Sequence, residues 1–470
     1  MSRSTRPRDL HVTFDPDART PLRWQLANQI RDACRTGRLP AGTSLPASRE
    51  LARQLGVSRG VVTDAYGQLA AEGYIAIEER RAPVVSAGTA VRREREEVAP
   101  LYDYLREDLR WRFDLTSITP DITTFPREAW GRALRGVVRD LPVHDLGYGD
   151  PRGPLAFREA VCDYLARARG CDVDPVTTIA VCGFTDGLYL ICRTLARGGA
   201  RRIAMEDPGL REAVDGIRLA GLEPVPVPVD GAGMRVDLLA RCDVQAVLVC
   251  PAHQFPTGVV MPPDRRDALL AWAEETGAVV IEDDYDAEFR YDRLPVGTLQ
   301  GRAPERVAYV GSVSKTLAPA LRIGWMHVPR AIVEPACDVY WHSGGGPPTI
   351  DLLAFASLLA GGDFERHLVR MRSAYHVRRL RLLTTFRELL PMCGVGGASA
   401  GLHLTLSLPA GVDADAVAAK LIARRVLVGS LASFAVEPAN AASALVIGYG
   451  RLHEAQVPDL ARLLADVIGS

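Results

Sequence analysis

Lys315 is the first residue whose type points to chemistry. The chain holds 56 Lys and Arg together, but only two are lysines, Lys315 and Lys420. Arginine supplies positive charge as well as lysine does, but only a primary amine can lose its proton and attack a carbonyl carbon. Lys420 lies in a stretch with the pattern of an amphipathic helix, where an exposed lysine needs no chemical role. Rarity alone leaves a chance surface position open for Lys315, so its neighbours must decide.

Polar residues at the ends of apolar, strand-like runs supply a matching set of groups. Pyridoxal 5'-phosphate requires an amine, a carboxylate for its pyridinium nitrogen, a donor for its phenolate oxygen and an anion site for its phosphate. Lys315 is predicted to form the Schiff base, Asp283 to meet the pyridinium nitrogen and Tyr285 to donate to the phenolate. Asp284 is an alternative to Asp283. The predicted phosphate site consists of Ser312, Arg322 and the helix start at Phe184 and Thr185.

An alternating α/β pattern must position these residues. Apolar strand-like runs are found at 179–182, 202–205, 246–250, 278–281 and 307–310. Helix-length segments lie between them at 184–197, 209–220 and 262–276. Runs that are apolar on both faces favour a mostly parallel sheet with helices on both sides, which binds ligands at the carboxyl ends of its strands. A smaller α+β region follows, with a long Arg-rich helix near 364–391, strands near 401–408 and 444–450, and a final helix to Ile468.

The first 90 residues have a different organisation. Helices are predicted at 20–36, 48–55 and 58–72, with Thr20 as the N-cap of the first and Ser58 as that of the third. A break at Gly56 gives the spacing of a helix-turn-helix, and a strand pair starting at Gly73 would form a wing. This segment carries thirteen Arg against nine Asp plus Glu, or +4, within a chain of net charge −1. A basic module favours an anionic partner such as DNA, although any small three-helix domain has a similar pattern.

Composition restricts the setting. The chain has 470 residues and 47% apolar content, which allows two to four domains with full cores. We find no run of eighteen apolar residues and no apolar signal segment, so the sequence favours a cytoplasmic protein without a membrane partner. The nine cysteines show no metal-like spacing, and no metal site is predicted. The mixed charges at 92–97 indicate a solvated tether.

The N-terminal motifs resemble GntR-type transcriptional regulators. The matching stretches are 45–52 (LPASRELA), 56–59 (GVSR), 65–69 (AYGQL) and 72–75 (EGYI). The resemblance implies a winged helix-turn-helix that binds an operator in double-stranded DNA. It implies DNA contacts from four residues, Arg49, Ser58, Arg59 and Thr63. The wing departs from the family's Gly-x-Gly-Thr tip, and Arg80 and Arg81 stand there instead.

Residues 113–470 resemble fold-type-I aminotransferases. The matching motifs include 148–155 (YGDPRGPL), 253–258 (HQFPTG), 283–286 (DDYD) and 312–315 (SVSK). Together with the N-terminal module they are similar to MocR-type regulators. The resemblance implies a DNA-binding domain at 10–86, a linker at 87–112, and an aminotransferase-like domain at 113–470 that binds the cofactor and an effector and forms a homodimer. It also implies that Tyr148 reaches the partner's cofactor phosphate.

Departures from the aminotransferase pattern bear on activity. Phe255 stands where true aminotransferases place an asparagine for the cofactor phenolate, and Leu210 replaces an aromatic residue that stacks on the cofactor. Val446 occupies the position expected for the arginine that clamps a substrate carboxylate, and Arg451 would need a strand shift to replace it. A bidentate clamp positions an amino acid for transamination. His253 is open to two interpretations, a place over the cofactor and an ordinary structural role.

Three hypotheses follow. The preferred one is a transcriptional regulator that depends on pyridoxal phosphate and senses this cofactor or an amino compound. The second is an active aminotransferase with a regulatory DNA-binding module, so the sequence leaves transamination open while favouring sensing. The third is a regulator whose large domain serves only for dimerisation.

Overall fold

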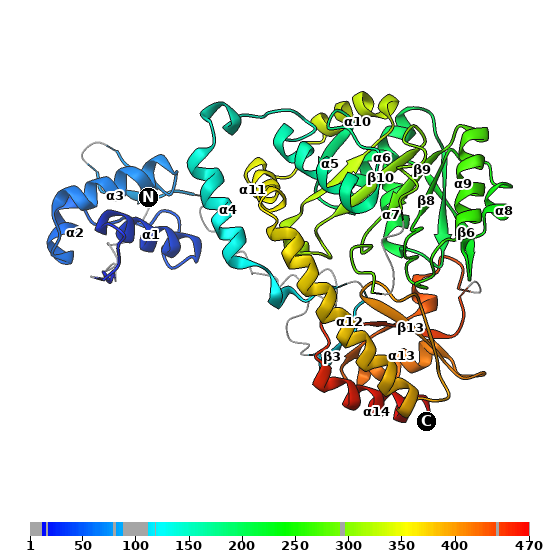
Figure 1. The fold of residues 1–470 in the computed structure, drawn as a ribbon. Helices are drawn as coiled ribbons and strands as arrows, with labels where there is room; N and C mark the ends of the chain where they lie inside the picture. The colour runs from blue at the N-terminus through cyan, green and yellow to red at the C-terminus, as the bar shows by residue number, and fades with distance from the viewer. Residues whose placement is uncertain are drawn as a thin grey trace. The chain divides into compact units, whose positions relative to one another are not determined.

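The computed structural model describes residues 12–15, 17–78, 81–87, 111–117, 119–291, 297–438 and 441–469. The chain divides into two compact units, Met1–Arg106 and Glu107–Ser470 (Figure 1). Arg80 and most of the predicted linker at 87–112 lie outside the described residues.

The N-terminal unit is a three-helix domain with a short strand pair. Its elements are α1 (Leu22–Arg35), α2 (Ser48–Leu55), α3 (Arg59–Ala71), β1 (Ile75–Ala76) and β2 (Val84–Val85), with β1 and β2 antiparallel. Gly56 ends α2 in the left-handed region (φ +67°), and α3 starts three residues later, which confirms the predicted spacing. The expectation for Thr20 was wrong, because α1 begins at Leu22 with Pro21 as its N-cap residue.

An eight-stranded sheet forms the centre of the second unit. In chain order its strands are β4 (Thr178–Val181), β5 (Arg202–Asp207), β6 (Glu223–Asp230), β7 (Gly233–Met234), β8 (Ala246–Val249), β9 (Val279–Asp283), β10 (Val307–Ser312) and β11 (Gly324–His327). Their spatial order is β4-β11-β10-β9-β8-β5-β6-β7. The pairs among β10, β9, β8, β5 and β6 are parallel, whereas β11 is antiparallel to both of its neighbours. The carboxyl ends of β5, β8, β9 and β10 therefore meet at one edge.

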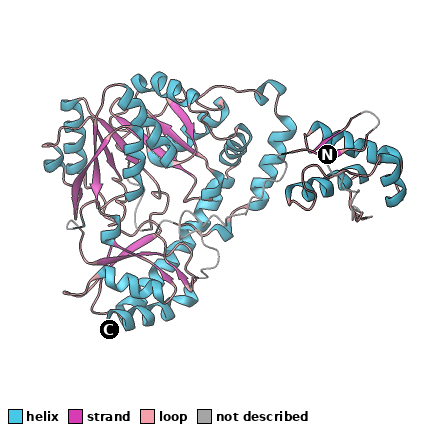
Figure 2. Ribbon diagram, turned by 180° about the vertical axis from the view of Figure 1, so that it is seen from behind, coloured by secondary structure: helices cyan, strands magenta, loops and turns pink. Residues whose placement is uncertain are grey.

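Helices cover both faces of this sheet, as Figure 2 shows. Side chains alternate along β8: Ala246 and Leu248 face one apolar cluster, and Val247 and Val249 face another. The first cluster includes side chains of α6 (Phe184–Arg197), α7 (Arg211–Ala220) and α10 (Arg330–His342). The second includes side chains of α8 (Val236–Leu239) and α9 (Pro263–Thr276). Burial on both faces explains why these strands are apolar throughout.

A smaller α+β region completes the second unit (Figure 1). Its sheet has the order β12-β13-β16-β15, with β12 (Gly394–Gly396), β13 (His403–Ser407), β15 (Gly429–Ser430) and β16 (Ala444–Gly448). The helices are α12 (Asp363–Leu389), α13 (Ala414–Ala423) and α14 (Val457–Ile468). A parallel pair of β14 (Val426–Leu427) and β3 (Phe113–Asp114) ties residues 113–114 to this region.

Three further helices contribute to the core of this unit. They are α4 (Arg127–Asp140), α5 (Leu155–Arg169) and α11 (Thr349–Ala360), and α11 packs against α4, α5 and α12. The core here includes Phe157, Phe355 and Phe364. All nine cysteines lie within the described residues and none forms a disulfide. Of the helices that the structure describes, none is both long enough and apolar enough to cross a membrane.

Candidate functional site

Lys315 and Asp283 lie at the same edge of the central sheet. Asp283 is the last residue of β9 and is paired with Val310 of the neighbouring parallel strand β10. β10 ends at Ser312, and the turn that follows carries Lys315. The negative charge of Asp283 is close enough to act on the Lys315 amine, where it favours the protonated form. The two residues that the sequence assigned to one cofactor are thus brought together.

The Lys315 amine has a depressed pKa. Burial lowers the pKa of this half-buried amine, and the carboxylates of Asp283, Asp286 and Glu212 oppose that effect only in part. A lowered pKa increases the fraction of neutral amine, which is the form that attacks a carbonyl carbon. Lys420, in contrast, is exposed on α13.

The two adjacent aspartates differ in their hydrogen bonding. Asp284 accepts from Nε of the buried Arg169 at 2.7 Å and from the Tyr309 hydroxyl at 2.7 Å. Among the described residues, Asp283 accepts one long contact, from the Cys250 thiol at 3.6 Å. The Oδ1 atoms of both aspartates are buried without a partner among these residues, so the two differ in the donors on their other oxygen. A buried acceptor without a donor is energetically costly and is expected where a ligand supplies the donor.

The Asp283 carboxyl also has a strongly shifted pKa. Burial raises the pKa of Asp283 well above 3.8, and the neighbouring charge of Asp284 raises it further. The Cys250 thiol and Lys315 act in the opposite direction. A cation held against Oδ1 would lower the pKa of this carboxyl again and favour its ionised form.

Tyr285 lies in a buried aromatic cluster beside this carboxylate. Its ring packs edge-on against Phe255 with centroids 6.1 Å apart, and Cys250 and Leu210 belong to the same cluster. Burial raises the pKa of Tyr285 well above 10, so its hydroxyl keeps its proton and remains a donor. The hydroxyl oxygen lies 3.1 Å from Nδ1 of His253.

The start of α6 lies close to Arg322, one of the residues predicted to bind the phosphate. Gly183 precedes the helix with φ +107°, a conformation that suits glycine, and a Cβ there would lie 3.8 Å from both the Arg322 Nη1 and the Ser314 Oγ. The first-turn amides at Phe184 and Thr185 are unpaired by helix geometry. Ser312, by comparison, is buried, and its Oγ accepts a long bond from the Ser314 backbone at 3.4 Å.

The positions that depart from the aminotransferase pattern are apolar or already paired. Val446 is buried in β16 and packs with Leu431, and Phe434 packs against this cluster. Arg451 forms an ion pair with Asp114 at 2.7 Å. No arginine is therefore directed from this strand toward Lys315 in the part of the chain that the structure describes. Leu210 packs against the Phe255 and Tyr285 cluster.

Tyr148 is almost fully exposed, whereas Lys315, Asp283, Tyr285 and Ser312 are buried or half-buried. Its side chain is 97% exposed and contacts Trp341 edge-on, with ring centroids 6.3 Å apart. Trp341 is also exposed, at 51%, so the two rings together form an exposed apolar area.

In the N-terminal unit, the residues predicted to contact DNA lie on the surface. Arg49, Ser58, Arg59 and Thr63 are all exposed. Arg59 and Thr63 are four residues apart, so they share one face of α3, while Val62, Ala65, Tyr66 and Leu69 face the core. Neither Arg49 nor Arg59 pairs with a described residue, whereas Arg31 bonds Glu72 at 2.7 Å. Arg81 of the wing pairs with Glu78 at 2.7 Å.

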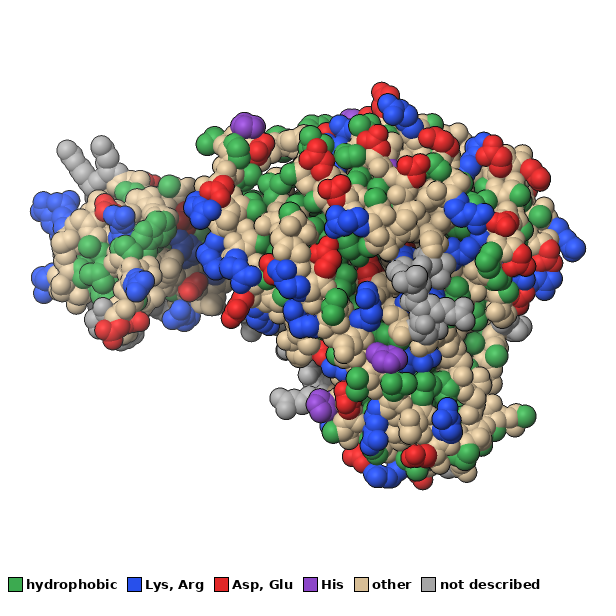
Figure 3. Space-filling model, in the orientation of Figure 1, with side chains coloured by type: hydrophobic (Ala, Val, Ile, Leu, Met, Phe, Trp, Pro, Cys, Tyr) green, Lys and Arg blue, Asp and Glu red, His purple; other side chains and the backbone are tan. Residues whose placement is uncertain are grey.

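The surface in Figure 3 mixes basic and acidic side chains over both units. This agrees with the net charge of −1. On the face that Figure 3 shows, no broad basic area dominates.

Sequence reasoning missed several residues of the site. Cys250 donates to Asp283, Ser314 borders Gly183, and Asp286 lies beside His253 at 3.0 Å. The apolar run 246–250 made Cys250 look like strand interior. Ser314 and Asp286 lie within the motifs 312–315 and 283–286, so their place in these motifs could have indicated a role. Their partners could not be predicted, because they lie far away in the sequence.

Family comparisons agree with this two-part architecture. Residues 22–85 match the family described as bacterial regulatory proteins, gntR family. Residues 143–458 match aminotransferase class I and II, which covers more than half of the chain.

Similar curated proteins combine the same two parts. The chain is 34% identical over 402 residues to the HTH-type pyridoxine biosynthesis transcriptional regulator PdxR of Corynebacterium glutamicum, covering 85% of this chain and 86% of that one. This chain belongs to the MocR-type family of GntR regulators. A second MocR-type relative, the probable rhizopine catabolism regulatory protein MocR of Rhizobium meliloti, is 32% identical over 383 residues and covers 78% of each chain.

Solved structures similar to the second unit are aminotransferases. An archaeal alanine:glyoxylate aminotransferase has a TM-score of 0.70 at 25% identity, covering 76% of this chain and 90% of that one. The kynurenine aminotransferase of Pyrococcus horikoshii, solved with PMP, has a TM-score of 0.69 at 24% identity, with coverage of 76% and 90%. The aminotransferase class I and II family depends on pyridoxal phosphate. The MocR-type chain is therefore a DNA-binding transcriptional regulator with an aminotransferase-like, pyridoxal-phosphate-dependent domain.

Proposed function

We propose that this MocR-type regulator senses pyridoxal phosphate or an amino compound through its large domain and does not turn substrate over. The observation that carries the proposal is the apolar cluster at Val446, where a carboxylate clamp would be required for transamination. Arg451 is engaged with Asp114 and does not replace the clamp. The protein acts in the cytoplasm as a homodimer, and ligand binding shifts the geometry of its two DNA-binding modules.

Four features support the assignment of the cofactor residues. Lys315 holds the cofactor covalently, as its lowered pKa favours. Asp283 meets the pyridinium nitrogen through its unpartnered Oδ1. Asp284 also has an unpartnered Oδ1, but it is the weaker candidate because its Oδ2 already accepts from Arg169 and Tyr309. Tyr285 donates to the phenolate oxygen. The phosphate is held by the α6 start at Phe184 and Thr185 together with Ser312 and Arg322, to which we add Ser314. When bound, the cofactor supplies an aldehyde that reacts with amines.

Exposure supports the remaining assignments. Tyr148, at 97% exposed, is free to reach the cofactor phosphate of a second copy. Arg49, Ser58, Arg59 and Thr63 present exposed polar groups from α2 and α3 to a DNA groove. We assign residues 10–86 to DNA binding, 87–112 to the linker, and 113–470 to effector binding and dimerisation.

Absorption spectroscopy of the full-length protein tests cofactor binding. Adding pyridoxal phosphate should produce a visible band from the Lys315-bound cofactor, and the band should saturate at one cofactor per chain. A spectrum that equals the sum of free cofactor and protein would remove the sensing proposal and favour a domain used only for dimerisation.

Turnover assays test the absence of catalysis. With the band present, pairs of amino acids and keto acids should give at most a single half-turnover per site. Sustained turnover of any pair would instead identify the domain as an active aminotransferase.

A further inference from the structure

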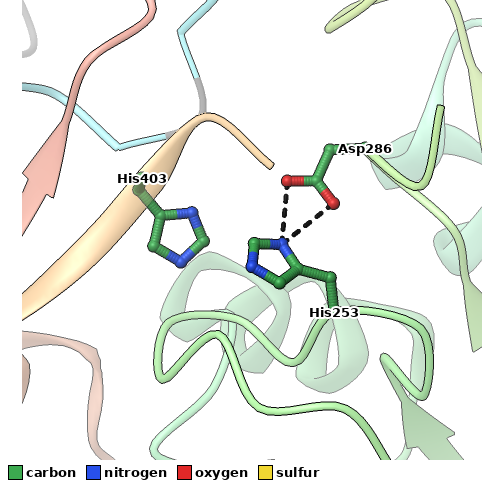
Figure 4. Close-up of side chains that lie close together, drawn as sticks. All are labelled: His253, Asp286 and His403. Atoms are coloured by element: carbon green, nitrogen blue, oxygen red, sulfur yellow. Dashed lines mark hydrogen bonds and ion pairs between the residues drawn. The ribbon is translucent and has the colours of Figure 1, made fainter. Parts of the chain in front are cut away.

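A cluster of buried polar side chains lies next to the Tyr285 hydroxyl. His253 follows β8 and Asp286 follows β9, and both side chains are at most 2% exposed. Nδ1 of His253 lies 3.0 and 3.1 Å from the two oxygens of Asp286, as Figure 4 shows. The same nitrogen lies 3.1 Å from the Tyr285 hydroxyl. One ring nitrogen therefore contacts both the carboxylate and the phenol.

Asp286 decides the direction of these hydrogen bonds. A carboxylate only accepts, so its contacts with Nδ1 place the ring hydrogen on that nitrogen. An Nδ1 that carries hydrogen cannot accept from Tyr285, so the Tyr285 hydroxyl does not donate to His253, and its oxygen can only share the single Nδ1 hydrogen with Asp286. The Tyr285 hydrogen is then left to donate elsewhere. Without Asp286, His253 would be able to carry its hydrogen on Nε2 instead, and its Nδ1 would then accept the hydrogen bond from Tyr285.

The smaller α+β region closes the cluster from the other side. His403 of β13 lies with its ring centroid 5.0 Å from that of His253, and its Nε2 donates to the Pro256 carbonyl at 3.1 Å (Figure 4). A Cβ at Gly401 would lie 2.2 Å from Cε1 of His253 and 2.5 Å from Asp286 Oδ2. Glycine at 401 thus permits a backbone approach that holds the imidazole in one orientation.

We propose that His253, oriented by Asp286 and held in place by His403 and Gly401, is a positioning residue that directs the Tyr285 hydroxyl toward the cofactor's phenolate oxygen. The inference rests on the proposed binding of the cofactor at Lys315. Phe255 offers no donor at the neighbouring position, so the phenolate depends on Tyr285 alone among these side chains. His253 and Asp286 therefore leave the Tyr285 hydrogen free to donate to the phenolate oxygen. In true aminotransferases an asparagine at the position of Phe255 would also donate to that oxygen.

A metal ion is the competing occupant of this cluster. One possible ligand atom from each of His253, Asp286 and His403 lies within 4.8 Å of the others. In a metal site the ligand atoms would converge at about 2.0–2.2 Å from one centre. Here Asp286 is already engaged with the ring hydrogen of His253, an arrangement that favours hydrogen bonding over coordination. Chelation separates the two possibilities.

The experiment measures the pH titration of the visible band in full-length protein loaded with pyridoxal phosphate. A phenol that donates to the phenolate stabilises its unprotonated form and so lowers the apparent pKa of the Lys315–cofactor linkage. His253→Leu should raise this apparent pKa by about 1 unit, which corresponds to one lost hydrogen bond. Asp286→Asn should raise it less, and His253→Gln should restore part of the change because its amide can donate.

A double-mutant cycle separates positioning from general disruption. Tyr285→Phe should produce a rise at least as large, and adding His253→Leu to Tyr285→Phe should produce little further change. The matched control is His327→Leu. His327 is a buried histidine of β11 that bonds Thr177 and Thr178 at the start of β4, away from Tyr285 in the sequence and in its hydrogen bonds. His327→Leu should leave the titration unchanged.

Four outcomes would overturn the inference. These are an unchanged titration in His253→Leu and Asp286→Asn, a shift that adds in full to that of Tyr285→Phe, an equal shift in His327→Leu, or a shift reproduced by a chelator in the unsubstituted protein. The last would assign the cluster to a metal. Absence of the band in the unsubstituted protein would instead overturn the proposed function and this inference with it.

Discussion

The two units use their functional side chains in opposite ways. In the N-terminal unit Arg49 and Arg59 are exposed and form no ion pair with a described residue. In the second unit Asp283 and Tyr285 are buried, and burial shifts the pKa of both well upward. A surface cation costs little stability while it waits for a phosphate, whereas a buried acceptor without a donor costs stability until its ligand arrives.

This difference predicts how each unit responds to substitution. Changes at the DNA-binding surface should alter affinity and leave folding intact. Changes at the cofactor site should alter both stability and cofactor binding. Where the substituted group has no strong hydrogen-bond donor, stability should rise while cofactor binding weakens. The predictions below test this contrast.

The largest effect is expected from Lys315→Ala. This variant should lose the visible band completely, because it removes the amine that lies near Asp283. Its thermal stability without cofactor should not fall, since a half-buried cation with a lowered pKa is removed. The control is Lys420→Ala, which removes the other lysine of the chain from an exposed position on α13. An intact band in Lys315→Ala would contradict the assignment.

The adjacent aspartates should respond with opposite signs. Asp284→Asn leaves the buried Arg169 guanidinium without its charged partner, and we expect the free energy of unfolding to fall by about 3–5 kcal/mol. Asp283→Asn should raise the stability of the cofactor-free protein and weaken cofactor binding by about 1.5–3 kcal/mol. Denaturant titration and spectral titration measure the two effects. A loss of stability in both variants would remove the distinction between them.

The Asp283 effect has a defined pH dependence. Burial raises its folded-state pKa well above 3.8, so its favourable contribution to folding is complete below about 3.8. That contribution is lost as the pH rises through the raised folded-state pKa. The stability advantage of Asp283→Asn in the cofactor-free protein should therefore grow with pH and disappear in acid.

The same contrast explains what could be predicted from sequence. Periodicity identified α6 at 184–197 and placed the strands at 202–205 and 307–310, since their apolar side chains face two helical layers. It missed β11 at Gly324–His327, a four-residue strand that follows a short turn, and β6, whose three prolines at 224, 226 and 228 resemble a loop. Strand β11 interrupts the otherwise parallel order beside β10.

The candidate site could be proposed from the sequence where residue type alone indicates the chemistry. Lys315, Asp283 and Tyr285 followed from the groups a cofactor needs, and Arg49 and Arg59 from a family motif. Which aspartate is paired depends on Arg169, which is 115 residues away from Asp284. The contacts of His253 with Asp286 and His403 depend in the same way on tertiary structure. Partners supplied by distant segments carry no local pattern.

A smaller effect is expected at the DNA-binding surface. Arg59→Ala should weaken operator binding by about 1–3 kcal/mol if its guanidinium contacts a base. The control is Arg53→Ala on α2, whose exposed guanidinium is already paired with Glu50 at 3.0 Å. Fluorescence anisotropy with operator DNA measures both variants, and thermal melting should find their folding unchanged. Equal losses for Arg53→Ala and Arg59→Ala would indicate general electrostatics rather than a placed contact.

The smallest effect tests whether a surface residue serves the ligand or the fold. Ser58 precedes α3, yet its side chain forms no capping hydrogen bond. Ser58→Ala should therefore change the free energy of unfolding by less than about 0.5 kcal/mol, below the usual cost of losing a helix cap. If its hydroxyl contacts a phosphate, DNA binding should weaken by about 0.5–1.5 kcal/mol. A stability loss without a change in DNA affinity would make Ser58 a structural residue and remove one of the four predicted contacts.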